Sequence, residues 1–177
     1  MLAQAVTLLS LLGLAAIVLV AAHGDFRRFV IPNRLSLALA SLAPVYWGAA
    51  TAAGYITPPS IWLVLVLALA VFALGFGLFA AGVMGGGDIK LMTALALWMT
   101  PGQAVRVFFV ISLAGGVLAL AMALARLWQA RAQASITERG EQSAWQVLSK
   151  QPIPYGVAIA AGGLALAGEL IVNALTQ

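Results

Sequence analysis

The stretch Met84-Gly85-Gly86-Gly87-Asp88-Ile89-Lys90 interrupts a sequence that is otherwise almost continuously apolar. Hydrophobic residues make up 63% of the 177 residues and charged residues only 8%, which excludes an ordinary soluble globular protein. An acid inside a membrane-spanning region costs about 2.5–3.5 kcal/mol, so Asp88 is expected to face protein or water rather than lipid. The composition therefore predicts an all-α fold, a polytopic membrane helical bundle that forms a single domain over residues 1–177.

Apolar runs separated by short polar connections predict about six transmembrane helices. They cover approximately residues 2–22, 32–51, 62–81, 89–100, 104–125 and 153–173. A helix over residues 89–100 would rise only about 18 Å, too little to cross the membrane alone. Either this helix includes the preceding glycines, or Asp88 lies below the lipid surface in a protein-lined recess that water reaches. The polar segment of about 126–151 is either a surface helix or a mobile lid.

Basic residues alternate between the connections, and this alternation predicts the orientation. All but one fall in the first, third and fifth connections: Arg27, Arg28 and Arg34, then Lys90, then Arg126, Arg131, Arg139 and Lys150. The exception, Arg106, lies just inside the fifth span. Cytoplasmic loops carry such an excess, so both termini are predicted outside and the odd-numbered connections in the cytoplasm. The sequence pI of about 10.1 therefore reflects membrane orientation rather than nucleic-acid binding. Trp47, Trp62 and Trp98 are predicted to form an aromatic belt at the outer interface.

The chain contains only two aspartates, Asp25 and Asp88, and the predicted topology places both on the cytoplasmic side. Two neighbouring carboxylates share one proton, because both cannot ionise cheaply. Such a pair supplies a general base for water and a general acid for a peptide bond, without metal or cofactor. The alternatives are an Asp88 that only caps a helix and an Asp25 in a solvated ion pair. A metal site built on the pair lacks further ligands nearby, and the absence of cysteine excludes a thiol nucleophile.

Three motifs in order resemble the type IV prepilin peptidases. The stretch Asp25-Phe26-Arg27-Arg28-Phe29-Val30-Ile31-Pro32-Asn33 resembles their first catalytic motif, an Asp several residues before Ile-Pro-Asn. Gly85-Gly86-Gly87-Asp88 fits the Gly-x-Gly-Asp motif that they share with presenilin-like intramembrane proteases. Pro154-Tyr155-Gly156, followed by an Ala/Gly-rich helix, is similar to the last recurring block of the short members, which serve tight-adherence (Flp-type) pili.

The resemblance implies that Asp25 and Asp88 are the catalytic pair of an aspartic endopeptidase in the bacterial inner membrane. Its partners would be the lipid bilayer and a prepilin, whose short basic leader is cut from its hydrophobic helix at the cytoplasmic face, just after a glycine. Longer family members carry a cytoplasmic insertion, often with a cysteine tetrad, that is linked to N-methylation. This chain passes directly from its first span to Asp25 and has no cysteine, so peptidase activity without methyltransferase activity is expected.

Supporting roles are predicted for further residues near the two motifs. Pro32 suits the first turn of the second span, and Asn33 either caps that span or hydrogen-bonds Asp25. Lys90 is interpreted as an anchor that reaches the headgroups, with favouring ionisation of the pair as the alternative. Tyr155 is a candidate for closing the site. The remaining motif-supporting positions are Gly85, Gly87 and Gly156.

A second class of function fits the intramembrane acids equally well. A small membrane transporter, or a protein that binds protons or a cation, would also use Asp25 and Asp88. Such a path requires polar groups that continue to the far side of the membrane. The second and third spans offer few beyond Ser36, Ser41 and Thr51, which favours the peptidase. Glu169 lies too far along the last span to join the pair and is interpreted as a packing or interfacial residue.

Overall fold

The computed structural model describes residues 1–55, 61–134 and 154–176, and within these ranges it contains helices and no strand. The helices are α1 (Leu2–Arg28), α2 (Asn33–Ala52), α3 (Ile61–Ala80), α4 (Gly86–Ala96), α5 (Pro101–Ala134) and α7 (Tyr155–Thr176). All but α4 are long and apolar enough to cross a membrane. The predicted polytopic helical bundle is confirmed, with five candidate spans and one short helix.

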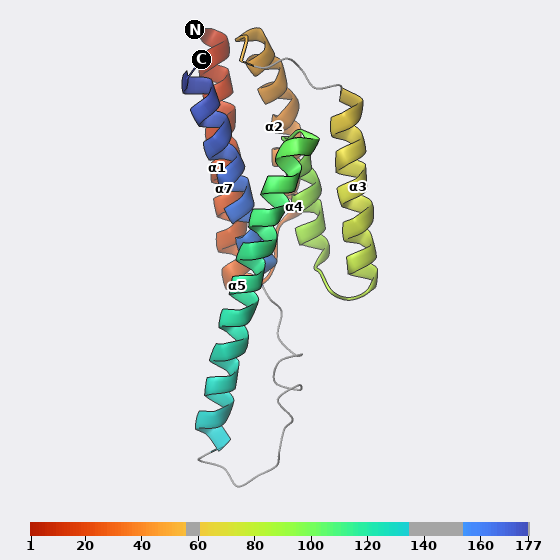
Figure 1. Cartoon of the computed structure of the whole chain (residues 1–177), viewed down its shortest axis with the longest axis vertical. Helices are drawn as coiled ribbons and strands as arrows, with labels where there is room; N and C mark the ends of the chain where they lie inside the picture. Colours follow the sequence, from red (N-terminus) through yellow and green to blue (C-terminus); the bar gives the residue numbers. More distant parts are fainter. Residues whose placement is uncertain (56–60, 135–153, 177) are drawn as a thin grey trace.

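The helices run alternately up and down, so that both chain ends lie at the same end of the bundle (Figure 1). The connection between α1 and α2 and the turn between α3 and α4 both lie at the opposite end. α1 packs against α2 and α7, and α5 packs against α7, whereas α4 packs against α2, α3 and α7. The end of α1 and the start of α4, which carry the two aspartates, therefore face the same side.

Helix α1 is longer than the sequence predicted. It continues through Asp25 to Arg28, whereas the apolar run suggested a polar connection from His23 onward. Arg27 and Arg28 occupy its last turn, where positive charge interacts favourably with the free carbonyl groups of a helix C-terminus. The helix ends at Phe29, which adopts the left-handed conformation (φ 52°) and donates its N–H to the Asp25 carbonyl at 2.8 Å. Asp25 consequently has a fixed position on a helix rather than in a loop.

Helix α4 begins within the glycines, as one alternative predicted, and is nevertheless too short to span a membrane. It includes Gly86, Gly87 and Asp88, begins after an extended Gly85 and spans 11 residues, about 16 Å of rise. It ends at Ala96, where Trp98 donates its N–H to the Leu95 carbonyl in a tight turn. The short helix therefore lies among longer ones and does not itself cross the membrane.

Trp98 does not belong to an interfacial belt, and that prediction is wrong. Its side chain is 0% exposed and its Nε1 donates to the Leu39 carbonyl of α2 at 2.9 Å. Trp47 makes the converse contact, from α2 to the Leu97 carbonyl at the end of α4, at 2.8 Å. Trp62 is 72% exposed, as an interfacial residue would be. The two indole hydrogen bonds link the C-terminal end of α4 to α2.

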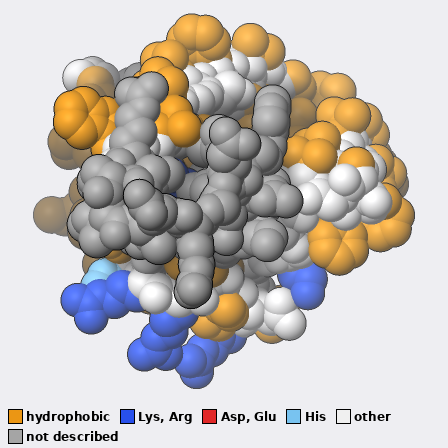
Figure 2. Space-filling model, turned by 90° about the horizontal axis from the view of Figure 1, so that it is seen from below, with side chains coloured by type: hydrophobic (Ala, Val, Ile, Leu, Met, Phe, Trp, Pro, Cys, Tyr) orange, Lys and Arg blue, Asp and Glu red, His pale blue; other side chains and the backbone are white. Residues whose placement is uncertain are grey.

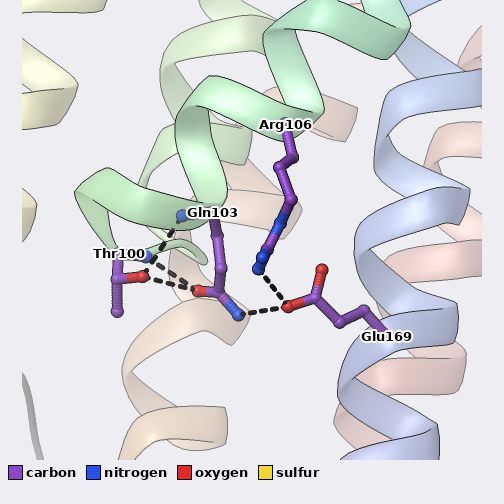
Figure 3. A network of polar contacts seen from close by, with 4 residues as sticks. All are labelled: Thr100, Gln103, Arg106 and Glu169. Carbon is purple, nitrogen blue, oxygen red and sulfur yellow. Dashed lines mark hydrogen bonds and ion pairs between the residues drawn. The ribbon is translucent and has the colours of Figure 1, made fainter.

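Helix α5 begins with a capping box and extends further than predicted. Thr100 and Gln103 exchange hydrogen bonds: the Thr100 N–H donates to Gln103 Oε1 at 2.9 Å, and the Gln103 N–H donates to Thr100 Oγ1 at 3.4 Å (Figure 3). Gln103 Nε2 also donates to Glu169 Oε1 of α7. The same oxygen forms an ion pair with the Arg106 guanidinium at 2.6 Å. This network confirms that Glu169 is remote from the aspartates. At its other end α5 runs on to Ala134, so the first part of the predicted 126–151 segment is helical; residues 135–153 lie outside the described residues.

Small residues allow close helix packing at three glycines of α5 and α7. A Cβ on Gly162 would clash with the Ile111 side chain and lie 3.1 Å from the Val107 carbonyl, whereas one on Gly163 would lie 3.0 Å from Val18. Gly115 faces the Ala158 methyl group at ordinary contact distance. Gly116, in contrast, has nothing within 4 Å of an added Cβ. Close packing therefore concentrates on α7, the helix that carries the Pro-Tyr-Gly motif.

Candidate active site

Asp25 lies in the last turn of α1 and is only 5% exposed. Its own helix end is unfavourable for a negative charge, because free carbonyl groups point toward it. The first turn of α7 compensates, since the backbone N–H of Gly156 donates to Asp25 Oδ2 at 2.7 Å. A short bond of this kind to a carboxylate is charge-assisted. The carboxylate thus binds the N-terminus of a helix that lies 131 residues further along the chain.

Glycine is required at this contact. A Cβ on Gly156 would lie 2.9 Å from both Cβ and Oδ2 of Asp25 and 3.0 Å from Cδ1 of Ile31. No side chain fits these distances without moving α1 or α7. The sequence singled out Gly156 through its motif, and the contact gives the physical reason for a glycine at that position.

Asp88 is the third residue of α4 and is 8% exposed. The helix N-cap is Gly85, so Asp88 is not the N-cap residue itself and reaches the N-cap amide from the first turn. The Asp88 carboxylate bends back to the Gly85 backbone amide, and a Cβ on Gly85 would lie 3.0 Å from Oδ2. The second oxygen, Oδ1, is buried without a hydrogen-bond partner in the part of the chain that the structure describes. Buried polar oxygens in proteins usually have a hydrogen-bond partner, and protonation of the Asp88 carboxyl or a bound water would supply one here.

The electrostatics of Asp88 depend on Asp25. The pKa of the Asp88 carboxyl is raised to about 6: burial raises it most, the nearby charge of Asp25 also raises it, and the Gly85 amide partly offsets both. α4 is not one of the five spans, and Asp88 belongs to its first turn. Asp25 is therefore near enough for its charge to raise the pKa of Asp88.

Ile31 lies between the helix ends that carry this pair. A Cβ on Gly87 would lie 3.2 Å from Ile31 Cβ and 3.4 Å from its carbonyl oxygen, and Gly156 approaches Ile31 Cδ1 from α7. Ile31 is 7% exposed and belongs to the main hydrophobic core. In the sequence analysis Ile31 was only one position of the first motif, and no role was predicted for it. The sequence feature that could have indicated its burial is an apolar residue directly before Pro32 in an otherwise charged connection.

Asn33 and Lys90 contact each other rather than the aspartates. Lys90 Nζ donates to Asn33 Oδ1 at 3.0 Å, which links α4 to the start of α2. The N-cap of α2 is Pro32, without a side-chain cap bond, so neither prediction for Asn33, capping the span or hydrogen-bonding Asp25, is observed. Both Lys90 and Asn33 are exposed, and Tyr155 is half-buried at the start of α7. Lys90 thus holds the glycine-rich turn against α2 from outside the buried pair.

Basic side chains gather along one edge of this end of the bundle, and hydrophobic side chains surround it (Figure 2). Arg27, Arg28 and Arg34 are exposed there, as is Lys90. In the described ranges no three His, Cys, Asp or Glu residues come together as a metal site would require. A separate cavity of about 170 Å³ lies among Thr7, Tyr46, Tyr55 and Asn173, near the opposite end. Its lining contains neither aspartate.

Five candidate spans, with two buried aspartates at one end of the bundle, define a polytopic membrane protein. The model of the type IV leader peptidase family matches residues 12–120, more than half of the chain, and the chain belongs to that family. The match includes both aspartates and ends before α7. No curated protein and no solved structure matches the chain. Membership supports a type IV leader peptidase-like protease with a prepilin substrate.

Proposed function

We propose that this chain is an aspartic endopeptidase of the bacterial inner membrane. It removes the short basic leader from Flp-type prepilins at the cytoplasmic face, with Asp25 and Asp88 as its catalytic pair. The observation that supports the proposal is that both acids are buried at the same end of the bundle (Figure 1), although they lie 63 positions apart in the sequence. The surroundings are buried and apolar, which strengthens proton sharing between carboxylates.

The pair supplies both halves of peptide hydrolysis. The ionised carboxylate removes a proton from water as the water oxygen bonds to the peptide carbonyl carbon, and the protonated carboxyl gives its proton to the carbonyl oxygen. The tetrahedral diol then collapses: the C–N bond breaks, the first carboxyl protonates the leaving amine, and the second recovers a proton from a diol hydroxyl. The pair returns to its starting state, and no cofactor is consumed.

The distribution of charge supports the cytoplasmic orientation. Arg27, Arg28, Arg34 and Lys90 lie at the end that carries the acids, whereas Arg106 at the far end is paired with Glu169. Because the chain has no cysteine, single cysteines report the orientation without background. We expect Gln129→Cys to react with an impermeant maleimide only in inside-out vesicles and Thr51→Cys only in right-side-out ones. The reverse pattern would contradict the proposed face.

The Flp-type assignment and the lack of methyltransferase activity rest on the short connection after α1. Only residues 29–32 separate α1 from α2, which leaves no insertion at that point, and the sequence has no cysteine for a tetrad. We expect mass spectrometry of the processed pilin to find an unmethylated N-terminus. A methylated terminus formed by the purified chain and a methyl donor would overturn this part of the proposal.

Co-expression with a cognate Flp-type prepilin tests the function. We expect the wild-type chain to release the leader, and Asp25→Asn and Asp88→Asn each to reduce cleavage by at least about 10³-fold while the protein remains inserted. Glu169→Gln, an acid at the other end of the bundle, is the matched control and is expected to cleave normally. Cleavage at the wild-type rate by either aspartate variant would refute the catalytic pair. Proton or cation flux in proteoliposomes, without cleavage, would favour the transporter alternative instead.

A further inference from the structure

The two aspartates of the pair have different environments. Asp25 Oδ2 accepts a 2.7 Å hydrogen bond from the Gly156 N–H at the first turn of α7. Asp88 also faces a backbone amide, that of Gly85, but its Oδ1 is buried with no partner in the described part of the chain. A backbone N–H at a helix N-terminus favours a carboxylate over a carboxylic acid. A buried oxygen without a donor favours the protonated form. These two observations distinguish two groups that the mechanism leaves interchangeable.

We propose that the backbone amide of Gly156 keeps Asp25 ionised, so that Asp25 is the general base that activates water and Asp88 carries the shared proton. Gly156 is then a positioning residue that acts through Asp25. This inference rests on the proposed function and assigns the roles within it. It also extends the site to α7, which lies beyond the residues that the family model matches.

The remaining titratable groups that the structure describes at this end leave the assignment unchanged. On α4, Asp88 itself is the acid coupled to Asp25, and the Lys90 ammonium is turned outward to Asn33. On α1 and α2, His23, Arg27, Arg28 and Arg34 are exposed. On α7, Tyr155 is half-buried beside Gly156. The donor that directly contacts the Asp25 carboxylate is the Gly156 amide.

The α1–α7 interface offers a matched control seven residues away on each helix. Gly163 of α7 faces Val18 of α1, just as Gly156 faces Asp25. A Cβ on Gly163 would lie 3.0 Å from Val18, and one on Gly156 would lie 2.9 Å from Asp25. Gly156→Ala and Gly163→Ala therefore disturb the same pair of helices by similar amounts. Only Gly156→Ala moves the donor away from a carboxylate.

The decisive experiment titrates the buried carboxyl groups by infrared difference spectroscopy on the full chain in detergent, without substrate. In the Asp88→Asn background the signal of the remaining aspartate, Asp25, gives its protonation midpoint. We expect Gly156→Ala to raise that midpoint by about one pH unit, because the ionised form loses its donor, and Gly163→Ala to leave it unchanged. We also expect the Asp88 midpoint, read in Asp25→Asn, to lie above the Asp25 midpoint read in Asp88→Asn.

Two results would overturn the proposal: an Asp25 midpoint that Gly156→Ala leaves in place, or one that lies above the Asp88 midpoint. Because the titration needs no prepilin, these results are independent of whether the chain cleaves one. If wild-type cleavage is observed, its acid limb is expected to move upward by about one pH unit in Gly156→Ala, a tenfold loss on the acid side, and to stay fixed in Gly163→Ala. An identical profile for the two alanine variants would contradict the role of Gly156.

Discussion

Replacing Asp88 by Asn is expected to stabilise the fold at neutral pH, although it removes a catalytic group. The pKa of Asp88 is raised from 3.8 to about 6, mainly by burial and secondarily by the charge of Asp25. The folded protein therefore binds the Asp88 proton more tightly than the unfolded chain does. Stability from this group is fully present below pH 3.8 and is lost as the pH rises through about 6.

The magnitude follows from the difference of about two pKa units between 3.8 and 6. At about 1.36 kcal/mol per unit, ionised Asp88 destabilises the fold by about 3 kcal/mol above pH 6. Asn resembles the protonated acid and does not titrate. Asp88→Asn is therefore expected to raise the free energy of unfolding by about 3 kcal/mol at pH 8 and by less than about 1 kcal/mol at pH 4.

The assay is reversible unfolding in mixed micelles, followed by circular dichroism at several pH values. Glu169→Gln is the control, because this acid is half-buried, is paired with Arg106 and is expected to show no such pH-dependent gain. A stabilisation by Asp88→Asn that is the same at pH 4 and pH 8, or that is absent at pH 8, would refute the reasoning. In either case Asp88 would not be ionised at a cost in the folded protein.

Two further predictions concern the packing that holds the site. Gly162→Ala is expected to lower the free energy of unfolding by about 1–3 kcal/mol, and with it the midpoint of thermal unfolding, because its Cβ would press on the α5 backbone. Gly116→Ala, whose Cβ would lie in open space, is expected to be neutral or to stabilise the fold by up to about 1 kcal/mol. Equal effects at both glycines would contradict the packing. Trp98→Phe is expected to cost about 1–3 kcal/mol in the same measurement, because the hydrogen bond to the Leu39 carbonyl is lost and a void is left. The control Trp62→Phe, on the exposed surface, is expected to change the free energy of unfolding by less than about 0.5 kcal/mol. An equally small effect of Trp98→Phe would show that the hydrogen bond from Trp98 to the Leu39 carbonyl contributes little.

The helices were predictable from the sequence because hydrocarbon thickness sets their length. Apolar runs locate α2, α3 and α7 to within a few residues, and the rise per residue identifies α4 as too short to span. Helix ends were less predictable where tertiary contacts decide them. Residues 23–28 are polar enough for a loop, but α1 continues through them, with its last turn favoured by Arg27 and Arg28 and the buried Asp25 bound by α7.

The site was predictable as two motifs but not as a geometry. The absence of any other aspartate, together with the predicted topology, indicated Asp25 and Asp88. The donor on Gly156 comes from a helix 131 residues away, and no local pattern reveals such a contact. Trp98 was misplaced for a similar reason: an indole at the end of an apolar run has the same sequence context whether it faces lipid headgroups or the Leu39 carbonyl.

The central claim is that the two aspartates share one site, and cysteine cross-linking in native membranes tests it most directly. The chain has no cysteine of its own, so an Asp25→Cys, Asp88→Cys double variant carries only the two reporters. A disulfide requires Cα atoms within about 7 Å, and a short bifunctional thiol reagent extends that reach. We predict intramolecular cross-linking of positions 25 and 88 and none between positions 25 and 169. Failure of the first pair to cross-link, or equal cross-linking of both pairs, would contradict a shared site.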